Sequence, residues 1–297
     1  MDYLGALLGA GATIMKSVET YYQDLIASPN GYSGQFYDQG GDHPDYRRLW
    51  PVMRRMVSRG VKSVYEVGCG DGFVLKLCKR AGIRPLGGCD ITSVMLEKSN
   101  DLLKSDLLHL PLIVADLEDA LSLAPALSIL RVTPPDAVLC LGVMPHVVDD
   151  RQALQNLRML GRVGTVYFIE IRNALFHLFT MNRYTVDFFR ELIGNTPSWS
   201  RVENMLRARL QMSAPPPEPT RRRFHNPLTF VDLLKDAGFG APTFHWYHAH
   251  AMPPWMIGLI GFDNEAKHHS TALALERTQD WRLTFLCSAA VVEVEAL

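Results

Sequence analysis

The stretch VYEVGCGDGFVLK, residues 64–76, decides the fold of this 297-residue chain. It runs from β-branched and aliphatic residues through three glycines, Gly68, Gly70 and Gly72, into an amphipathic segment. The order of strand, glycine-rich turn and helix is typical of the first unit of a parallel α/β sheet that binds a nucleotide-like ligand. Glycine is needed in such a turn because a side chain there would hold the ligand away from the backbone.

Short aliphatic runs alternate with amphipathic runs on both sides of this turn, which predicts βαβ units and a parallel sheet. The expected strands cover 63–67, 85–90, 111–116, 137–142 and 165–171, with a last strand within 284–296. The expected helices, whose apolar residues recur every three or four positions, cover 72–81, 92–104, 118–129 and 150–160. A parallel sheet binds its ligands at the carboxyl ends of its strands, so the functional site is expected there.

Composition places the chain among ordinary globular proteins, with 47% hydrophobic and 21% charged residues. The formal net charge of -1 argues against nucleic acid as a partner, because a phosphate backbone attracts strongly basic surfaces. Its length predicts one enlarged domain or a domain with additions. We expect an N-terminal helical lid segment (1–60), a core (61–173), an inserted helical and proline-rich lid (174–240) and C-terminal strands that complete the core (241–297).

The cysteines and the N-terminal run indicate where the protein works. Five scattered cysteines with no CxxC pair predict free thiols, a reducing compartment and no structural zinc site, hence a cytoplasmic protein. The apolar start at residues 4–14 lacks a preceding basic residue and is too short to cross a membrane, so we expect no membrane association. This run would cover the protein's own core or, equally well, close a homodimer interface.

Two common ligand-binding classes do not fit the glycine turn. The GxGxxG fingerprint of nicotinamide-dependent dehydrogenases requires glycine at position 73, where this chain has Phe73. The GxxxxGK[ST] loop of nucleotide triphosphatases is absent from the sequence. Hydride transfer and triphosphate hydrolysis are therefore disfavoured.

The pattern E-V-G-C-G-D-G resembles motif I of the class I S-adenosylmethionine-dependent methyltransferases, and later landmarks follow in the order of that family. Asp90 closes the second strand, Asp116 follows the third, and residues 135–173 are similar to the ubiquinone-biosynthesis-type, small-molecule subgroup. The sequence departs from that subgroup at GRVGT (161–165), where a lysine-proline-glycine-glycine turn is usual. The resemblance implies a Rossmann-like, seven-stranded, mainly parallel sheet with helices on both faces and an antiparallel last strand.

The resemblance also implies S-adenosylmethionine as cofactor and assigns residues to it. Asp90 would bind the ribose hydroxyls, and Asp116 would lie beside the adenine amino group. Either carboxylate could instead serve only as a helix N-cap, and the glycines could form a merely structural turn. The complete set of expected cofactor-binding residues is Glu66, Gly68, Gly70, Gly72, Asp90, Ile91, Asp116, Leu117 and Leu141.

Histidines are the candidate general bases, because a hydroxyl acceptor must lose a proton as it is methylated. His146 follows the fourth strand, where cofactor and acceptor would meet, and His43 lies in a loop that could close over the site. His248 belongs to the run FHWYHAH (244–250) and completes the catalytic candidates. Each could equally have a packing or surface role, and His225 with Asn226 is expected to cap a helix that begins near Thr229.

Aromatic and basic residues are the candidate acceptor-binding groups. As a strand, FHWYHAH would place Phe244, Trp246, His248 and His250 on one face and His245 and Tyr247 on the other. Two histidines on one face could hold a metal ion, but no third ligand is identifiable, so we predict no metal. The expected acceptor-binding residues are Tyr37, Arg172, Trp246 and Tyr247.

These observations predict a methyltransferase that acts on a small molecule. A weaker likeness of residues 172–189 to sugar and small-metabolite methyltransferases favours O-methylation of a sugar or a secondary metabolite with a histidine base. N- or C-methylation uses the same cofactor motifs and stays open, as does a catalytically silent cofactor-binding subunit. Nucleic-acid methylation is disfavoured, because the position of an N-P-P-Y-type motif reads Leu141, Gly142, Val143, Met144.

Overall fold

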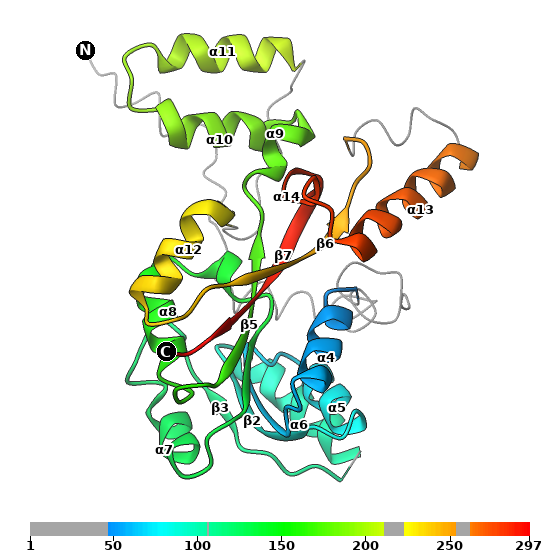
Figure 1. The fold of residues 1–297 in the computed structure, drawn as a ribbon. Helices are drawn as coiled ribbons and strands as arrows, with labels where there is room; N and C mark the ends of the chain where they lie inside the picture. The colour runs from blue at the N-terminus through cyan, green and yellow to red at the C-terminus, as the bar shows by residue number, and fades with distance from the viewer. Residues whose placement is uncertain (1–46, 106, 211–222, 254–261) are drawn as a thin grey trace.

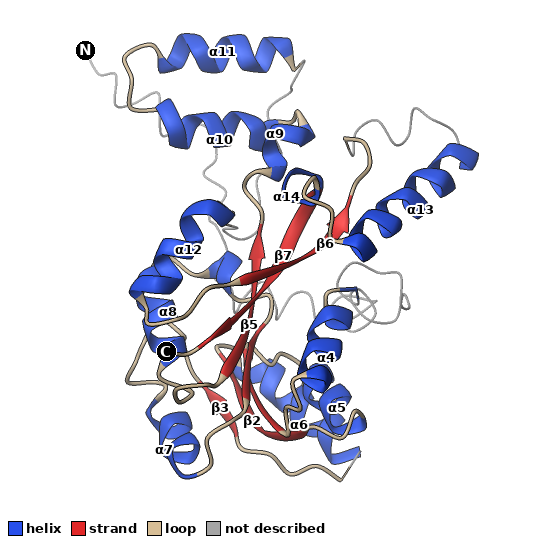
Figure 2. Cartoon of the chain, viewed as in Figure 1, coloured by secondary structure: helices blue, strands red, loops and turns tan. Residues whose placement is uncertain are grey.

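A seven-stranded sheet forms the centre of the computed structural model, which describes residues 47–105, 107–210, 223–253 and 262–297. The strand order is β3-β2-β1-β4-β5-β7-β6, with parallel pairing from β3 through β5 and antiparallel pairing of β7 with both β5 and β6. The predicted mainly parallel sheet with an antiparallel last strand is therefore confirmed (Figure 2). The strands are β1 Ser63–Val67, β2 Arg84–Asp90, β3 Leu112–Val114, β4 Ala137–Cys140, β5 Val166–Arg172, β6 Thr243–Ala249 and β7 Cys287–Glu295.

Helices cover both faces of this sheet, as predicted (Figure 1). The apolar cluster on one face includes residues of α7, α8 and α12, and the cluster on the other face includes residues of α4 and α5. The alternating side chains of each strand thus pack into two separate cores. The helices are α4 Leu49–Ser58, α5 Phe73–Arg80, α6 Ser93–Ser105, α7 Ala124–Val132, α8 Asp150–Arg158, α9 Phe176–Thr180, α10 Arg183–Ile193, α11 Trp199–Arg209, α12 Pro227–Asp236, α13 Phe262–Thr278 and α14 Leu283–Leu286, with a 3-10 turn, η1, at Met144–His146.

The helix expected at 118–129 begins later than predicted, at Ala124. Before Ala124, aspartate side chains bind backbone amides that a helix would use. Oδ1 of Asp116 accepts a hydrogen bond from the amide of Glu118, and Oδ1 of Asp119 accepts one from the amide of Leu121, each at 2.9 Å. Such turns hold the chain out of the helical conformation until a proline in the first turn of α7 favours it. The predicted start was therefore wrong by six residues, from 118 to 124.

The segment after β5 forms the short helices α9, α10 and α11, which extend beyond the end of the sheet (Figure 1). No residue of α11, all of which the structure describes, is buried. The later part of the segment returns to the sheet as α12, where the side chain of Asn226 accepts a hydrogen bond from the amide of Leu228 at 3.0 Å. This confirms the predicted capping role of Asn226. Within the described residues, no helix has the length and apolar character needed to span a membrane.

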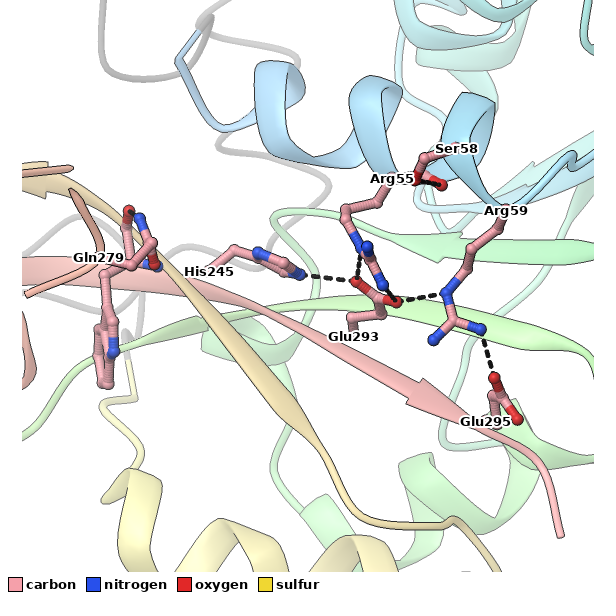
Figure 3. Close-up of polar contacts among 8 residues, drawn as sticks. Arg55, Ser58, Arg59, His245, Gln279, Glu293 and Glu295 are labelled. Carbon is pink, nitrogen blue, oxygen red and sulfur yellow. Dashed lines mark hydrogen bonds and ion pairs between the residues drawn. The ribbon is translucent and has the colours of Figure 1, made fainter. Parts of the chain in front are cut away.

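A buried carboxylate fixes α4 to the sheet (Figure 3). The side chain of Glu293 in β7 is 1% exposed and accepts hydrogen bonds from Arg55 Nε at 2.7 Å, Arg59 Nε at 2.5 Å and His245 Nε2 at 2.7 Å. Burial by itself would raise the pKa of Glu293, but the bonds from Arg55, His245 and Arg59 outweigh it and lower the pKa to about 2. The carboxylate is therefore ionised throughout the neutral range.

We expect Glu293→Gln to lower the free energy of unfolding at pH 7 by about 2 kcal/mol, because two guanidinium groups lose their counter-charge. Since the folded pKa of about 2 lies below the unfolded value of about 4.3, the contribution is complete above the unfolded value and is lost as the pH falls toward 2. Urea unfolding at pH 7 and at about pH 3 measures this, and the difference between the two proteins should be clearly smaller at the lower pH. A difference that stays constant with pH would contradict the assignment.

Candidate functional site

The glycine turn lies where β1 meets α5 and is tied to the end of β2. The amide of Gly68 donates to the carbonyl of Cys89 at 2.7 Å, and Gly68 and Gly72 have φ values of +70° and +81°. A Cβ on Gly68 would stand 2.2 Å from Cγ2 of Val143, and a Cβ on Gly72 would stand 2.4 Å from Oγ of Ser99. Both conformation and space therefore require glycine at these two positions.

Asp90, at the end of β2, is placed directly against the turn. Its Oδ2 accepts a hydrogen bond from the amide of Gly70 at 2.9 Å, and its Oδ1 accepts bonds from the amide of Thr92 at 2.9 Å and from Oγ1 of Thr92 at 2.5 Å. The carboxylate is half-buried and has about four acceptor positions, so it keeps capacity for a further donor. Asp90 thus holds the turn in shape and remains partly exposed.

Glu66, in β1, is 2% exposed, and its Oε2 has no hydrogen-bond partner among the described residues. Burial raises the pKa of Glu66 well above its ordinary value; the charge of Arg48 opposes this rise, and Asp71 and Asp90 add to it. A buried carboxyl group without a donor is costly unless a ligand completes it. This orphaned oxygen beside a glycine turn fits a ligand that presents a positively charged amino group, as S-adenosylmethionine does.

The other expected cofactor residues differ in exposure. Asp116 follows β3 and is half-buried, whereas Leu117 and Leu141 are each 5% exposed and belong to the apolar clusters of the core. Ile91 is 43% exposed at the end of β2. The structure therefore brings Glu66, the glycines, Asp90 and Ile91 to one edge of the sheet, at the carboxyl ends of the strands, as predicted.

His146 lies at the end of η1, just past β4. Its amide donates to the carbonyl of Val143 at 2.9 Å, and Val143 is the residue that a Cβ on Gly68 would strike. The loop that carries His146 is therefore adjacent to the glycine turn. The two remaining N-terminal candidates, His43 and Tyr37, lie outside the described residues.

The run at 244–250 leaves the extended backbone conformation at His248, although the rings of His248 and His250 lie 4.6 Å apart. Phe244 and Trp246 do share one face, with stacked rings 5.5 Å apart. His248, however, has a φ of +57°, in the left-handed region, and its Nδ1 lies 2.6 Å from Oγ of Ser288. This strand is the outermost of the sheet, so Trp246 and His248 lie several strands away from the glycine turn.

Tyr247 is 2% exposed, and its hydroxyl donates to Oε1 of Glu170 at 2.6 Å. Its place is thus in the core beneath α4, and its expected role in acceptor binding stays a prediction. Arg172, the last residue of β5, keeps 34% of its side chain exposed at the carboxyl edge of the sheet. The described residues contain no group of three or more His, Cys, Asp and Glu that could hold a metal ion.

Sequence reasoning missed two charged residues at this edge. Arg48 precedes α4, and its Nη1 donates to Oε2 of Glu170 at 2.7 Å, although 122 residues separate the two. Burial alone would raise the pKa of Glu170, but Arg48, Arg172 and the Tyr247 hydroxyl outweigh it and lower the pKa. One signal was available, because Glu170 is a lone acid in the apolar run VYFIEI.

Ion pairs also hold the residues before α12 beside the loop that carries His146. Asp150, at the start of α8, pairs with Nη2 of Arg223 at 3.1 Å and with Nε2 of His225 at 3.2 Å. The amide of Arg223 also donates to the carbonyl of Pro145 at 2.8 Å. The residues that lead into α12 therefore lie along η1.

Comparisons with known proteins agree with this geometry. Residues 65–167 match a family model described as a methyltransferase domain. The chain is similar to magnesium protoporphyrin IX methyltransferase from Synechocystis PCC 6803, a structure with bound SAH, at 13% identity over 94% of this chain and 93% of that one, with a TM-score of 0.51.

Two further solved structures share the fold. An S-adenosylmethionine-dependent methyltransferase from Mesorhizobium loti has 12% identity, covering 84% of this chain and 97% of its own, with a TM-score of 0.50. The PH0226 protein from Pyrococcus horikoshii OT3 has 13% identity, covering 94% and 99%, also with a TM-score of 0.50. No curated protein matches the sequence.

Proposed function

Because the chain carries a methyltransferase domain of the class I S-adenosylmethionine-dependent type, we propose that it methylates a hydroxyl group of a small molecule, a sugar or a secondary metabolite. The observation that carries this proposal is the placement of His146 on the loop that touches the glycine turn. A base on η1 would therefore lie beside the cofactor residues, at the carboxyl end of β4.

Each residue of the site has a distinct task in this proposal. The glycine turn, Glu66 and Asp90 would hold the cofactor, with the carboxylates accepting hydrogen bonds from its amino and ribose hydroxyl groups. S-adenosylmethionine, when bound, supplies a methyl group on a sulfonium, which is already a strong electrophile. His146 would accept the proton that the acceptor hydroxyl loses, and alignment of the acceptor supplies the rest of the rate.

The acceptor would bind on the side of η1 and the end of β5. Arg172 is partly exposed there and can pair with a polar or anionic group of the acceptor. Helices α9 to α11 of the inserted segment continue from the end of β5 and would form a lid over the acceptor.

We expect His146→Ala to reduce methyl transfer by about a hundredfold, because a general base contributes roughly that factor or more. Its affinity for S-adenosylhomocysteine should change by less than about twofold, since the side chain removed belongs to the acceptor side. The assay follows methylated products by mass spectrometry, with a panel of hydroxylated sugars and phenolic metabolites offered to the wild-type protein and the variant.

His109→Ala is the matched control, because His109 is exposed and precedes β3 at the opposite edge of the sheet. It should keep wild-type turnover. Full turnover of His146→Ala with the same acceptor would remove His146 from the mechanism. Products methylated at nitrogen or carbon would replace the hydroxyl proposal, and cofactor binding without any transfer would favour a silent subunit.

A further inference from the structure

A buried chain of three polar side chains leads from the core to the cofactor residues. Glu170 of β5 has no exposed side-chain surface and accepts hydrogen bonds from the Tyr247 hydroxyl at 2.6 Å and from Arg48 Nη1 at 2.7 Å. Its two donors come from β6 and from the residue before α4, so three distant segments of the chain meet at one carboxylate. Each carboxylate oxygen of Glu170 therefore has a donor, and Arg172 Nη2 lies a further 3.9 Å from Oε1.

Arg48 is fixed at the carboxyl edge of the sheet. Its side chain is 9% exposed, and its Nη1 lies 3.6 Å from the point that a Cβ on Gly142 would occupy, just past the end of β4. Gly142 has a φ of +80°, so the backbone there both favours glycine and leaves the guanidinium close to the strand end. β1 pairs with β4 so that Val67 lies opposite Cys140, two residues before Gly142, and the guanidinium at this strand end therefore lies near the end of β1. Its positive charge also lowers the pKa of Glu66, two residues before the glycine turn, against the effect of burial.

A purely structural role does not account for this arrangement. Phe168, two residues before Glu170 and on the same face of β5, is fully buried in the apolar core that also contains Tyr247, and an apolar side chain at 170 would suit that core. Replacing a buried ion pair by apolar residues is often neutral or even stabilising. An ionised carboxylate here is best explained by what it holds in place.

We propose that Tyr247 and Glu170 are positioning residues, which hold the Arg48 guanidinium beside Glu66 so that the pair binds the amino-acid portion of S-adenosylmethionine. That portion carries one carboxylate and one ammonium group, and a guanidinium next to a carboxyl group is complementary to both charges. The inference rests on the cofactor assignment made above. It assigns recognition of the nucleoside to Asp90 and recognition of the amino-acid end to this buried chain.

The experiment compares two ligands on variants that each lose one buried hydroxyl. Tyr247→Phe removes the donor to Glu170 but keeps the ring, and we expect it to weaken S-adenosylhomocysteine binding by about fivefold. Adenosine lacks the amino-acid portion, so its affinity should change by less than about twofold. Tyr167→Phe is the matched control, because Tyr167 is also fully buried and its hydroxyl donates to the carbonyl of Arg158 at 3.0 Å, on the other face of the sheet.

Arg48→Lys provides a second variant that keeps the charge and loses the paired geometry of the guanidinium. It should weaken S-adenosylhomocysteine by about tenfold and again spare adenosine. Equal losses for both ligands, or unchanged S-adenosylhomocysteine binding in Tyr247→Phe and Arg48→Lys, would overturn the inference. Failure of the wild-type protein to bind S-adenosylhomocysteine would overturn the cofactor assignment as well, which distinguishes the two failures.

Discussion

Asp90→Ala is expected to weaken S-adenosylhomocysteine binding on the order of a thousandfold, because the substitution removes two functions at once. The carboxylate now holds the amide of Gly70 and both donors of Thr92, so the turn loses its support. The proposed contact with the ribose hydroxyls is lost as well. Calorimetric titration of the wild-type protein and the variant measures this, and NAD, which the turn is not built to bind, should show no binding to either protein.

Asp136→Ala is the matched control for this experiment. Asp136 also uses a carboxylate oxygen to hold the backbone, because its Oδ2 accepts from the amides of Lys62 and Ser63 at 2.9 and 3.0 Å. These residues lie at the amino ends of β1 and β4, at the edge opposite the site. Asp136→Ala should therefore lower stability and leave binding intact; equal losses of affinity in both variants, or wild-type affinity in Asp90→Ala, would contradict the role of Asp90.

The sheet could be predicted because each strand is encoded by a short, continuous stretch of sequence. Each strand from β1 to β5 is a short aliphatic run bounded by turn residues, and the predicted ranges overlap the observed ones. The glycine turn is also local, since the positive φ values of Gly68 and Gly72 fall within one stretch of thirteen quoted residues, 64–76. The resemblance to class I methyltransferases then predicted how these strands and helices combine into one sheet.

The buried network could not be predicted, because its contacts join residues far apart in the sequence. Arg48 and Tyr247 lie 122 and 77 residues from Glu170, and no periodicity connects them. For the same reason, neither the contact of Tyr247 with Glu170 nor its burial in the core beneath α4 could be predicted. The φ of +57° at His248 could not be predicted for a different reason, since strand patterns assume an extended backbone at every position.

Gly68→Ala should lower the free energy of unfolding by about 4 kcal/mol, with about 1–2 kcal/mol from the left-handed conformation and the rest from the collision with Val143. The new Cβ would stand 2.2 Å from Cγ2 of Val143, so either the turn or the loop that leads to His146 must move. Displacement of the turn should also weaken S-adenosylhomocysteine binding by about a hundredfold or more. Urea unfolding and calorimetric titration measure the two effects.

Two companion variants separate conformational strain from collision. Gly60→Ala introduces the same strain, because Gly60 has a φ of +68°, but nothing lies within 4 Å of its Cβ, so only about 1–2 kcal/mol should be lost and binding should persist. Val143→Ala removes the methyl group that would collide with the new Cβ. In a protein that already carries Val143→Ala, Gly68→Ala should therefore lower the free energy of unfolding only as much as Gly60→Ala does. A double variant as unstable as the sum of its single variants would show that Val143 and the glycine turn are not in contact, and the adjacency of His146 to the cofactor site would lose its structural basis.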